Sequence, residues 1–473
     1  MAGTWAEIPI GAKLYQNVEE TETTRAQAAL ENCFITEADG QRRFYGIADW
    51  VTLDDGGRVH GLNDDGAGNL IAVTTRGNVY RLDESGNAEN VTGVPVQGPG
   101  RPIFAKTKDG VMIAAGRAIV RLGEAQTDIL SEDAPNATHV QFIDNFILAN
   151  DEGRFFHSEA GTFTSWNPLD VFAANSEPDN VTAILVTPFR EVMMCGPQSI
   201  EQFERSVGTA SFFRRWTVGE GVSEPYALVH ADNALIAVND KRELVRSSGQ
   251  TSQPISIDIG AVIEAAGIDW SGAWIGGFPD QPLHFDGQKF ILLQLPNAAT
   301  PYGGKGLTYA YDYRQQKWCT LYGWDATKGR PDRWPGWCHW PLWDEVFIGG
   351  DNGQIGKLSK SVHTNFGATQ RMLARTAYLS EQGEITIDNL RVRLRRGVGD
   401  NTTDPTFSLR VRRDDGPWGR WQRKGLGKAG DRSMTVEFGR QGHGHVFQFE
   451  WEVTDDCSVE VHKMQAQVAQ IGY

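Results

Sequence analysis

The sequence predicts an all-β protein in which a β-propeller-like domain is followed by a C-terminal β-sandwich. Seven times between Val59 and Ser359, an apolar run leads into a Gly/Asp/Asn turn and out through a second apolar run. The spacing of about 35 to 55 residues is typical of a blade repeat. Beyond about residue 366 the pattern changes to regular alternation of apolar and polar residues, which favours half-buried strands.

The apolar runs explain why the repeats must pack together. A short apolar run bounded by turns is typical of a strand buried on both faces. One meander of such strands cannot bury its own apolar faces, so several must stack radially. In chain order the runs are LIAV, VMIAA, FILAN, VMMCG, LIAVN, FILL and VFIGG.

The changes of pattern predict three parts. Residues 1–50 are expected to form an N-terminal arm that packs on a neighbour or on the propeller, with one helix-compatible patch, TTRAQAALENC. Residues 51–365 are expected to form the propeller-like domain. The regular alternation that begins near Arg371 predicts a β-sandwich over residues 366–473.

Composition narrows the class of protein. The 473 residues carry a formal charge of −15, so the surface should repel nucleic acid except where basic groups cluster. No run of eighteen apolar residues occurs, and the chain does not begin with a basic segment followed by an apolar one, as a signal peptide would. These features predict a protein without a membrane anchor that is kept in a cytosol-like space.

The cysteines predict the redox state. An odd number of cysteines without a CxxC motif predicts reduced, buried thiols. They are Cys33, Cys195, Cys319, Cys338 and Cys457.

One basic cluster stands out in the C-terminal part. Arg391, Arg393 and Arg395 alternate with apolar residues in LRVRLRR, and RVRRDDGPWGRWQRKGLGK follows close behind. Alternation of this kind is typical of the solvated face of a half-buried strand. A contact with protein or phosphate is the alternative explanation.

Motifs for chemistry are weak throughout. The sequence has no GxSxG, no GxxxxGK[ST] and no GxGxxG after a strand. The metal candidates lack a full ligand set and are better explained as hairpin turns or buried thiols. We therefore predict no enzyme, with no catalytic, cofactor-binding or metal-binding residue. The metal candidates are His443 with His445, Cys319 with Cys338, and the turns LNDDGAGNL and GGDNGQ.

Five tryptophans crowd into the segment from Trp324 to Trp343. Such a cluster can form a sugar-stacking platform, an interface hot spot or the core between blades. Pro335 and Pro341 indicate a rigid loop and favour the interface. The protein-interface residues predicted on this basis are Trp334, Trp337, Trp340 and Trp343.

Several motifs carry a resemblance to a known family. FFHSE is followed by SWNPLDVFAANSEPDNV, an apolar strand and then SIEQF at Ser199 to Phe203. Near the end stand arginine-rich strands, a DGPWGRW turn, a glycine-rich loop before an aromatic strand, and the turn at Thr454 and Asp455. Over roughly residues 30–473 the chain resembles the packaged-DNA stabilisation proteins of short-tailed bacteriophages, the tail-hub or nozzle family.

The resemblance implies a structural virion protein assembled in the host cytoplasm. Such a protein forms a ring of about six copies below the portal and its adaptor, extends the DNA channel, helps to retain packaged DNA, and anchors tail fibres, spikes, a needle or a plug. DNA passes through without sequence-specific binding, and the family offers no catalytic residues. The alternatives are a carbohydrate- or receptor-binding propeller, which needs an exposed tryptophan in each blade, and a propeller enzyme.

Overall fold

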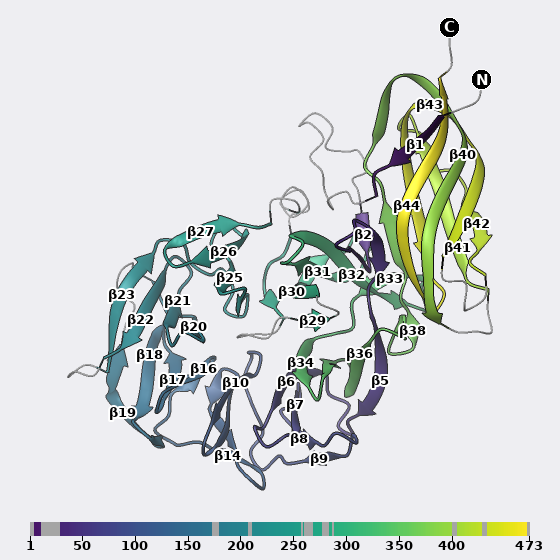
Figure 1. Ribbon diagram of the computed structural model, residues 1–473. Helices are drawn as coiled ribbons and strands as arrows, with labels where there is room; N and C mark the ends of the chain where they lie inside the picture. The colour runs from purple at the N-terminus through teal and green to yellow at the C-terminus, as the bar shows by residue number, and fades with distance from the viewer. Residues whose placement is uncertain are drawn as a thin grey trace.

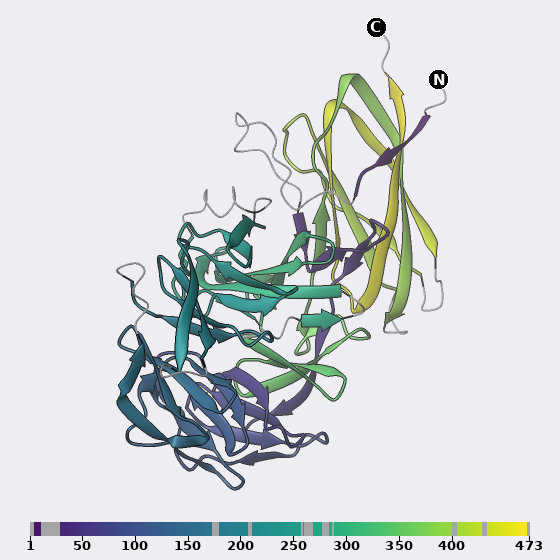
Figure 2. The same ribbon diagram turned by 60° about the vertical axis from the view of Figure 1, so that its left-hand side comes forward.

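The computed structural model describes residues 4–10, 29–172, 179–206, 211–256, 259, 268–276, 283–285, 288–399, 404–427 and 433–470. All elements bounded within these residues are strands, β1 to β44, which confirms the all-β prediction (Figure 1). The repeat region forms a ring of sheets, and the C-terminal strands form a β-rich domain beside it (Figure 2). A β-propeller followed by a β-rich domain is therefore the observed architecture.

Five four-stranded antiparallel sheets follow one another along the chain, each a simple meander from the inner to the outer strand. Their apolar runs form the second strand of each sheet and are buried on both faces, as in β7 and β25, because blades pack against both sides. The first two sheets are β6–β9 (Val59–Asp64, Leu70–Thr74, Val79–Leu82, Ala88–Asn90) and β10, β11, β13 and β14 (Ile103–Thr107, Gly110–Ala114, Val120–Leu122, Thr127–Ile129). The next three are β16–β19 (Val140–Ile143, Phe146–Asp151, Arg154–Glu159, Thr162–Phe172), β20–β23 (Ala183–Val186, Val192–Cys195, Ile200–Arg205, Phe212–Val218) and β24–β27 (Leu228–Ala231, Ala234–Val238, Leu244–Ser248, Thr251–Pro254). The short strands β12 (Arg117–Ala118) and β15 (Asn136–Ala137) pair between the second and third sheets.

A sixth sheet closes the ring with strands from both ends of the repeat region. β34 (Cys338–Leu342), β35 (Glu345–Gly349) and β36 (Gln354–Ser359) form its inner strands. β5 (Gly46–Thr52) adds antiparallel to β36, with Leu358 opposite Ile47. The edge of β5 is covered by β37 (Thr364–Asn365), which pairs with β38 (Ala368–Thr369). An N-terminal strand therefore holds the ring shut at its C-terminal blade, which hides an edge that would otherwise be open.

A seventh set of four hydrogen-bonded strands, here called the seventh path, completes the ring. It belongs to the same sheet as the strands of the C-terminal domain. It consists of β28 (Trp274–Ile275), β30 (Gln288–Ala299), β31 (Lys305–Asp312) and β32 (Lys317–Asp325), with β29 (Leu283–Phe285) and β33 (Arg330–Arg333) at its margins. β2 (Ala29–Glu31) bridges β32 to β39 (Met372–Arg375) and so to the large sheet. Six sheets are thus separate blades, and the seventh joins the two parts of the molecule.

Three long strands dominate the C-terminal domain. β40 (Leu379–Gly399) pairs with both β43 (Met434–Val453) and β44 (Cys457–Gln470), and β41 (Thr406–Arg413) lies between β42 (Gln422–Gly425) and β43. β1 (Thr4–Ile8), β3 (Cys33–Ile35) and β4 (Gln41–Arg43) add N-terminal strands along the β44 side. That the C-terminal domain is a β-sandwich stays a prediction. The domain boundaries between residues 50 and 51 and between residues 365 and 366 also stay predictions.

The N-terminal strands pack between the two parts. Phe34 and Phe44 lie edge-on against Phe290 of the seventh path, with ring centroids 5.3 and 5.2 Å apart. The buried Arg43 donates to the carbonyl oxygens of Cys457, at 2.9 Å, and His363, at 3.2 Å. These contacts join the start of the chain, the end of the propeller and the C-terminal domain.

The helix-compatible patch TTRAQAALENC is strand where the structure describes it. Ala29–Glu31 is β2 and Cys33 begins β3, whereas residues 23–28 lie outside the described residues. Leu30 and Cys33 are buried in the sheet. Pairing with β39 and burial of these side chains outweigh the helix propensity of the alanines.

Candidate functional site

The propeller axis holds a small cavity where five inner segments converge. Its volume is about 40 Å³, space for one or a few water-sized species. Gly61 lets β6 approach closely, since a Cβ there would come within 2.9 Å of Pro102. The Ile275 amide donates to the Tyr226 carbonyl at 3.0 Å, which ties β28 to the entry of β24. The lining residues are His60, Gly61, Leu62, Arg101, Pro102, Ile103, Phe104, Tyr226, Trp274, Ile275, Cys338 and His339.

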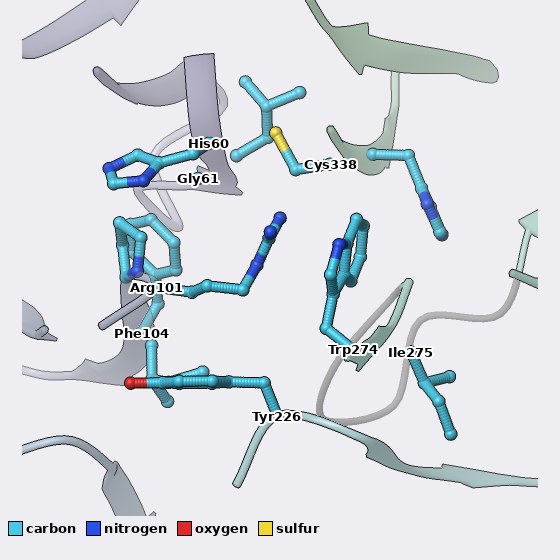
Figure 3. Close-up of a pocket in the computed structure, with 12 residues that line it drawn as sticks. His60, Gly61, Arg101, Phe104, Tyr226, Trp274, Ile275 and Cys338 are labelled. Atoms are coloured by element: carbon cyan, nitrogen blue, oxygen red, sulfur yellow. The ribbon is translucent and has the colours of Figure 1, made fainter. Parts of the chain in front are cut away.

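Arg101 is the charged group of this cavity. Its guanidinium lies over the Trp274 ring, 3.7 Å from the centroid, and donates to the Trp337 carbonyl oxygen. Figure 3 shows the side chain reaching across the cavity from one wall toward Trp274 on the other. Burial lowers the pKa of Arg101 to about 10, which leaves it charged at neutral pH.

His60 and His139, two histidines near the axis, are neutral at pH 7. Burial, with the nearby Arg101 and Arg58, lowers the pKa of His60 to about 3. Burial also lowers the pKa of His139 to about 3, and its ring stacks on Tyr226 with centroids 5.1 Å apart. The axis is therefore a positively charged, largely apolar centre, and the residues that line the cavity include no carboxylate.

The predicted interface tryptophans are mostly buried against their own chain. Trp334, Trp337 and Trp340 are 1, 8 and 7 % exposed, and Trp343 is half-buried. Trp334 belongs to the large core shared with the C-terminal domain, whereas Trp340 belongs to the core between the sixth sheet and the first blade. The structure thus separates the segment into two cores. Its role as a protein interface stays a prediction.

Trp337 lies between two guanidinium groups. Arg58 and Arg333 each lie 3.7 Å from its ring centroid, and its indole N–H donates to Asp351 at 2.9 Å. Asp351 also accepts from Arg58 at 3.1 Å and from Arg333 at 2.6 Å. One carboxylate therefore organises two cations and an indole at the junction of the sixth sheet and the first blade.

Trp340 and Trp343 fix the hairpin of the sixth sheet to the first blade. The Trp340 indole donates to Asp64 at 3.1 Å, and the Trp343 indole donates to the Gly68 carbonyl at 3.2 Å. Trp343 and Asp344 both have positive φ, 49° and 57°, and form a two-residue turn of the type that suits a twisted hairpin. The turn LNDDGAGNL accordingly serves as a blade contact.

The basic cluster divides into an exposed face and an internal network. Leu390, Val392 and Leu394 are buried, whereas the intervening arginines are exposed, as the alternation predicts. Arg391 pairs with Glu437 at 2.6 Å. A groove of about 360 Å³ lies along this face. Its lining residues are Arg393, Arg395, Ser433, His462 and Lys463. Both explanations, a solvated face and a protein or phosphate contact, stay open.

The second half of the cluster is internal. Arg375 and Arg410 both donate to the buried Glu450, at 2.7 and 2.6 Å. Arg410 also lies over Trp418 and Trp421 of the DGPWGRW turn, at 4.9 and 4.4 Å. The sequence signal for this ion-pair centre is a glutamate in the middle of an aromatic strand, FQFEWEV.

The remaining residues considered as metal ligands in the sequence do not gather into a site among the described residues. All five cysteines are free and buried, and burial raises the pKa of Cys195 to about 12. His443 is exposed and lies 3.9 Å from Glu384. Over the part of the chain that the structure describes, no three His, Cys, Asp or Glu residues gather closely enough to hold a metal ion, and no helix is long and apolar enough to cross a membrane.

Comparison with known proteins identifies the class. The family model described as Bacteriophage P22 Gp10, beta-propeller, matches residues 66–363, well over half of the chain. The match covers the strands of the repeat region from β7 to β36 and leaves out β5 and β6. The chain belongs to this family of phage structural proteins, which confirms the resemblance found in the sequence. No curated protein matches the sequence.

Three solved structures match this chain at low sequence identity. BamB from Moraxella catarrhalis is 10 % identical, with 76 % of this chain and 98 % of that chain covered and a TM-score of 0.38. The computationally designed Ika8 protein is 12 % identical, with 66 and 99 % covered and a TM-score of 0.37. The extracellular domain of the putative one component system BT4673 from B. thetaiotaomicron is 10 % identical, with 85 and 57 % covered and a TM-score of 0.40.

Proposed function

We propose that this phage structural protein is the tail hub, or nozzle, of a short-tailed bacteriophage. In this role a ring of about six copies lies below the portal and adaptor, extends the DNA channel and helps to retain the packaged genome. The family match over residues 66–363 is the observation that carries the proposal. The formal charge of −15 suits a channel through which DNA slides without sticking.

The surface of the propeller supports lateral contacts in such a ring. The outer strands of three consecutive blades, β14, β19 and β23, each carry an exposed large apolar side chain. These are Ile129, Leu169 and Phe213, of which Leu169 is 85 % exposed. Exposed apolar groups on neighbouring blades are typical of protein contact sites. The hairpin at Trp343 is a second candidate contact, with the portal, adaptor, fibre, spike or needle proteins as partners.

An enzymatic role is disfavoured by the geometry of the axis. The cavity of about 40 Å³ is far smaller than the roughly 300 Å³ at which substrate pockets begin. Among the side chains that line it, Arg101 is charged at neutral pH and His60 has a low pKa, so both are poor general bases there. A carbohydrate- or receptor-binding propeller is disfavoured because tryptophans of the crowded segment pack into the protein's own cores. Trp334 lies in the large core, and Trp340 lies in the core between the sixth sheet and the first blade. We propose that the protein acts in the virion without catalysis.

Assembly of the purified chain tests this proposal. Native mass measurement and negative-stain images of the chain with its portal and adaptor proteins should show a ring of about six copies on the adaptor. Replacement of Leu169 by aspartate should weaken the ring and leave the melting temperature unchanged, because the side chain is exposed in the single chain. A chain that stays monomeric and does not bind the adaptor would count against the hub.

A further inference from the structure

We propose that the axial cavity binds a small monovalent anion of the size of chloride, held by Arg101 and Trp274. Three independent features of the cavity support this assignment: an uncompensated cation, a buried donor without an acceptor, and space of the right size. The inference concerns the propeller itself and does not depend on its place in a virion.

The first feature is the charge of Arg101. Among the described residues, the titratable neighbours that act on its guanidinium are Cys338, Tyr226 and Arg58, none of them a carboxylate, and the cavity lining contains no carboxylate. Its hydrogen bond to the Trp337 carbonyl uses one donor, and the face of Trp274 covers one side of the plane. A guanidinium has five N–H donors, so donors remain for another partner. Arg101 is half-buried, and withdrawing a cation from water without a counter-charge is unfavourable, a cost that an anion reduces.

The second feature is the indole of Trp274. The side chain is 4 % exposed, and its Nε1–H has no hydrogen-bond acceptor among the described residues. A buried donor without an acceptor carries the full desolvation penalty of the group. Because the guanidinium of Arg101 lies over the face of this ring, an acceptor cannot stand between the two groups. One acceptor at the nitrogen edge of the stacked pair would be within reach of both.

The third feature is the size and polarity of the cavity. A volume of about 40 Å³ admits one chloride or a few water molecules, and it excludes sugars, nucleotides and folded peptide segments. Water would satisfy the indole but not the positive charge. The low pKa of His60, to which Arg101 and Arg58 contribute after burial, shows a positive local field that disfavours a bound cation.

A bound anion would couple segments that are far apart in sequence. Arg101 precedes β10, Trp274 begins β28, and the Trp337 carbonyl precedes β34. The anion would add to the links between these three inner strands. Chloride should therefore stabilise the propeller specifically, beyond the effect of ionic strength.

Thermal unfolding in matched salts tests the site. The full chain is melted in 10 and 300 mM sodium chloride and in sodium gluconate at equal ionic strength, and ³⁵Cl NMR line width reports binding directly. We expect the melting temperature to rise by about 2 °C more in chloride than in gluconate. We also expect broadening of the ³⁵Cl line that excess bromide reverses.

Two variants and one control locate the effect. Trp274→Phe removes the N–H and keeps an aromatic face, and Arg101→Gln removes the charge. Trp274→Phe should at least halve the chloride-specific shift, and Arg101→Gln should abolish it. Arg246→Gln is the matched control, because this cation on β26 pairs with Asp232, away from the cavity lining, and it should retain the shift.

Three results would overturn the proposal. They are equal melting in the two salts, a ³⁵Cl line that the protein leaves unchanged, and a chloride effect of full size in Trp274→Phe. The last result decides the matter even where Arg101→Gln does not fold. Loss of the chloride effect in Arg246→Gln alone would move the site to that surface pair and likewise reject the axis.

Discussion

Replacing Trp340 by alanine should unfold part of the propeller at lower temperature instead of only weakening assembly. The side chain is 7 % exposed, fills the core between the sixth sheet and the first blade, and donates to Asp64 at 3.1 Å. Loss of a buried tryptophan costs about 3–5 kcal/mol, a range that includes one lost hydrogen bond of about 1 kcal/mol. For a domain of this size the shift in melting temperature is about 6 °C.

Circular dichroism during heating measures the change, and native mass measurement reports assembly in parallel. Phe189→Ala is the matched control, because this aromatic side chain is 60 % exposed and its loss should change stability by less than about 0.5 kcal/mol. A Trp340→Ala chain that melts like the wild type and fails only to assemble would refute the reasoning. Trp340 would then be an interface anchor whose loss costs binding more than folding.

Three further predictions concern ion pairs, thiols and pH. Glu450→Gln should lower the free energy of unfolding in denaturant by about 3–5 kcal/mol, because it leaves Arg375 and Arg410 without their buried counter-charge. Glu437→Gln, at an exposed ion pair, should lower it by less than about 1 kcal/mol. Equal effects of the two changes would contradict the buried network. A thiol reagent should label none of the five buried cysteines until the protein unfolds, and rapid labelling of the native chain would contradict their burial. Burial holds the pKa of His139 near 3, below its unfolded value, so its contribution to stability is present above about pH 6.5 and falls by about 2 kcal/mol on going to pH 5. His139→Gln should flatten this part of the pH profile of unfolding, and an unchanged slope would contradict the shift.

The blade repeats could be predicted from sequence because each buried strand is a local signal. Runs such as LIAV and VMIAA are apolar on both faces and are bounded by turns, so the strand and its burial follow from neighbouring residues alone. The closing strand β5 could not be predicted in the same way. Gly46–Thr52 has a mixed pattern, and its partner β36 lies about three hundred residues away along the chain.

The site was harder to predict because it depends on pairs that are distant in sequence. The crowding of tryptophans is visible in the sequence, but the surroundings of Trp337 are not. Its indole donates to Asp351 beside Arg58, and this contact forms only when the propeller closes and brings the first blade against the sixth sheet. Arg101 stands in an ordinary loop sequence, QGPGRPIF, and its place at the axis follows only from the radial packing of the blades. The arginines of RVRRDD gave no hint that Glu450 would be their buried partner.

Virus particles that lack this chain test the central claim most directly. Particles made in cells that express every other virion protein are purified, and their packaged DNA is measured before and after the purified chain is added. We expect heads that package DNA but lose it and carry no tail below the adaptor, and recovery of both properties when the chain is supplied. Particles that retain their DNA and assemble complete tails without the chain would contradict the role as tail hub.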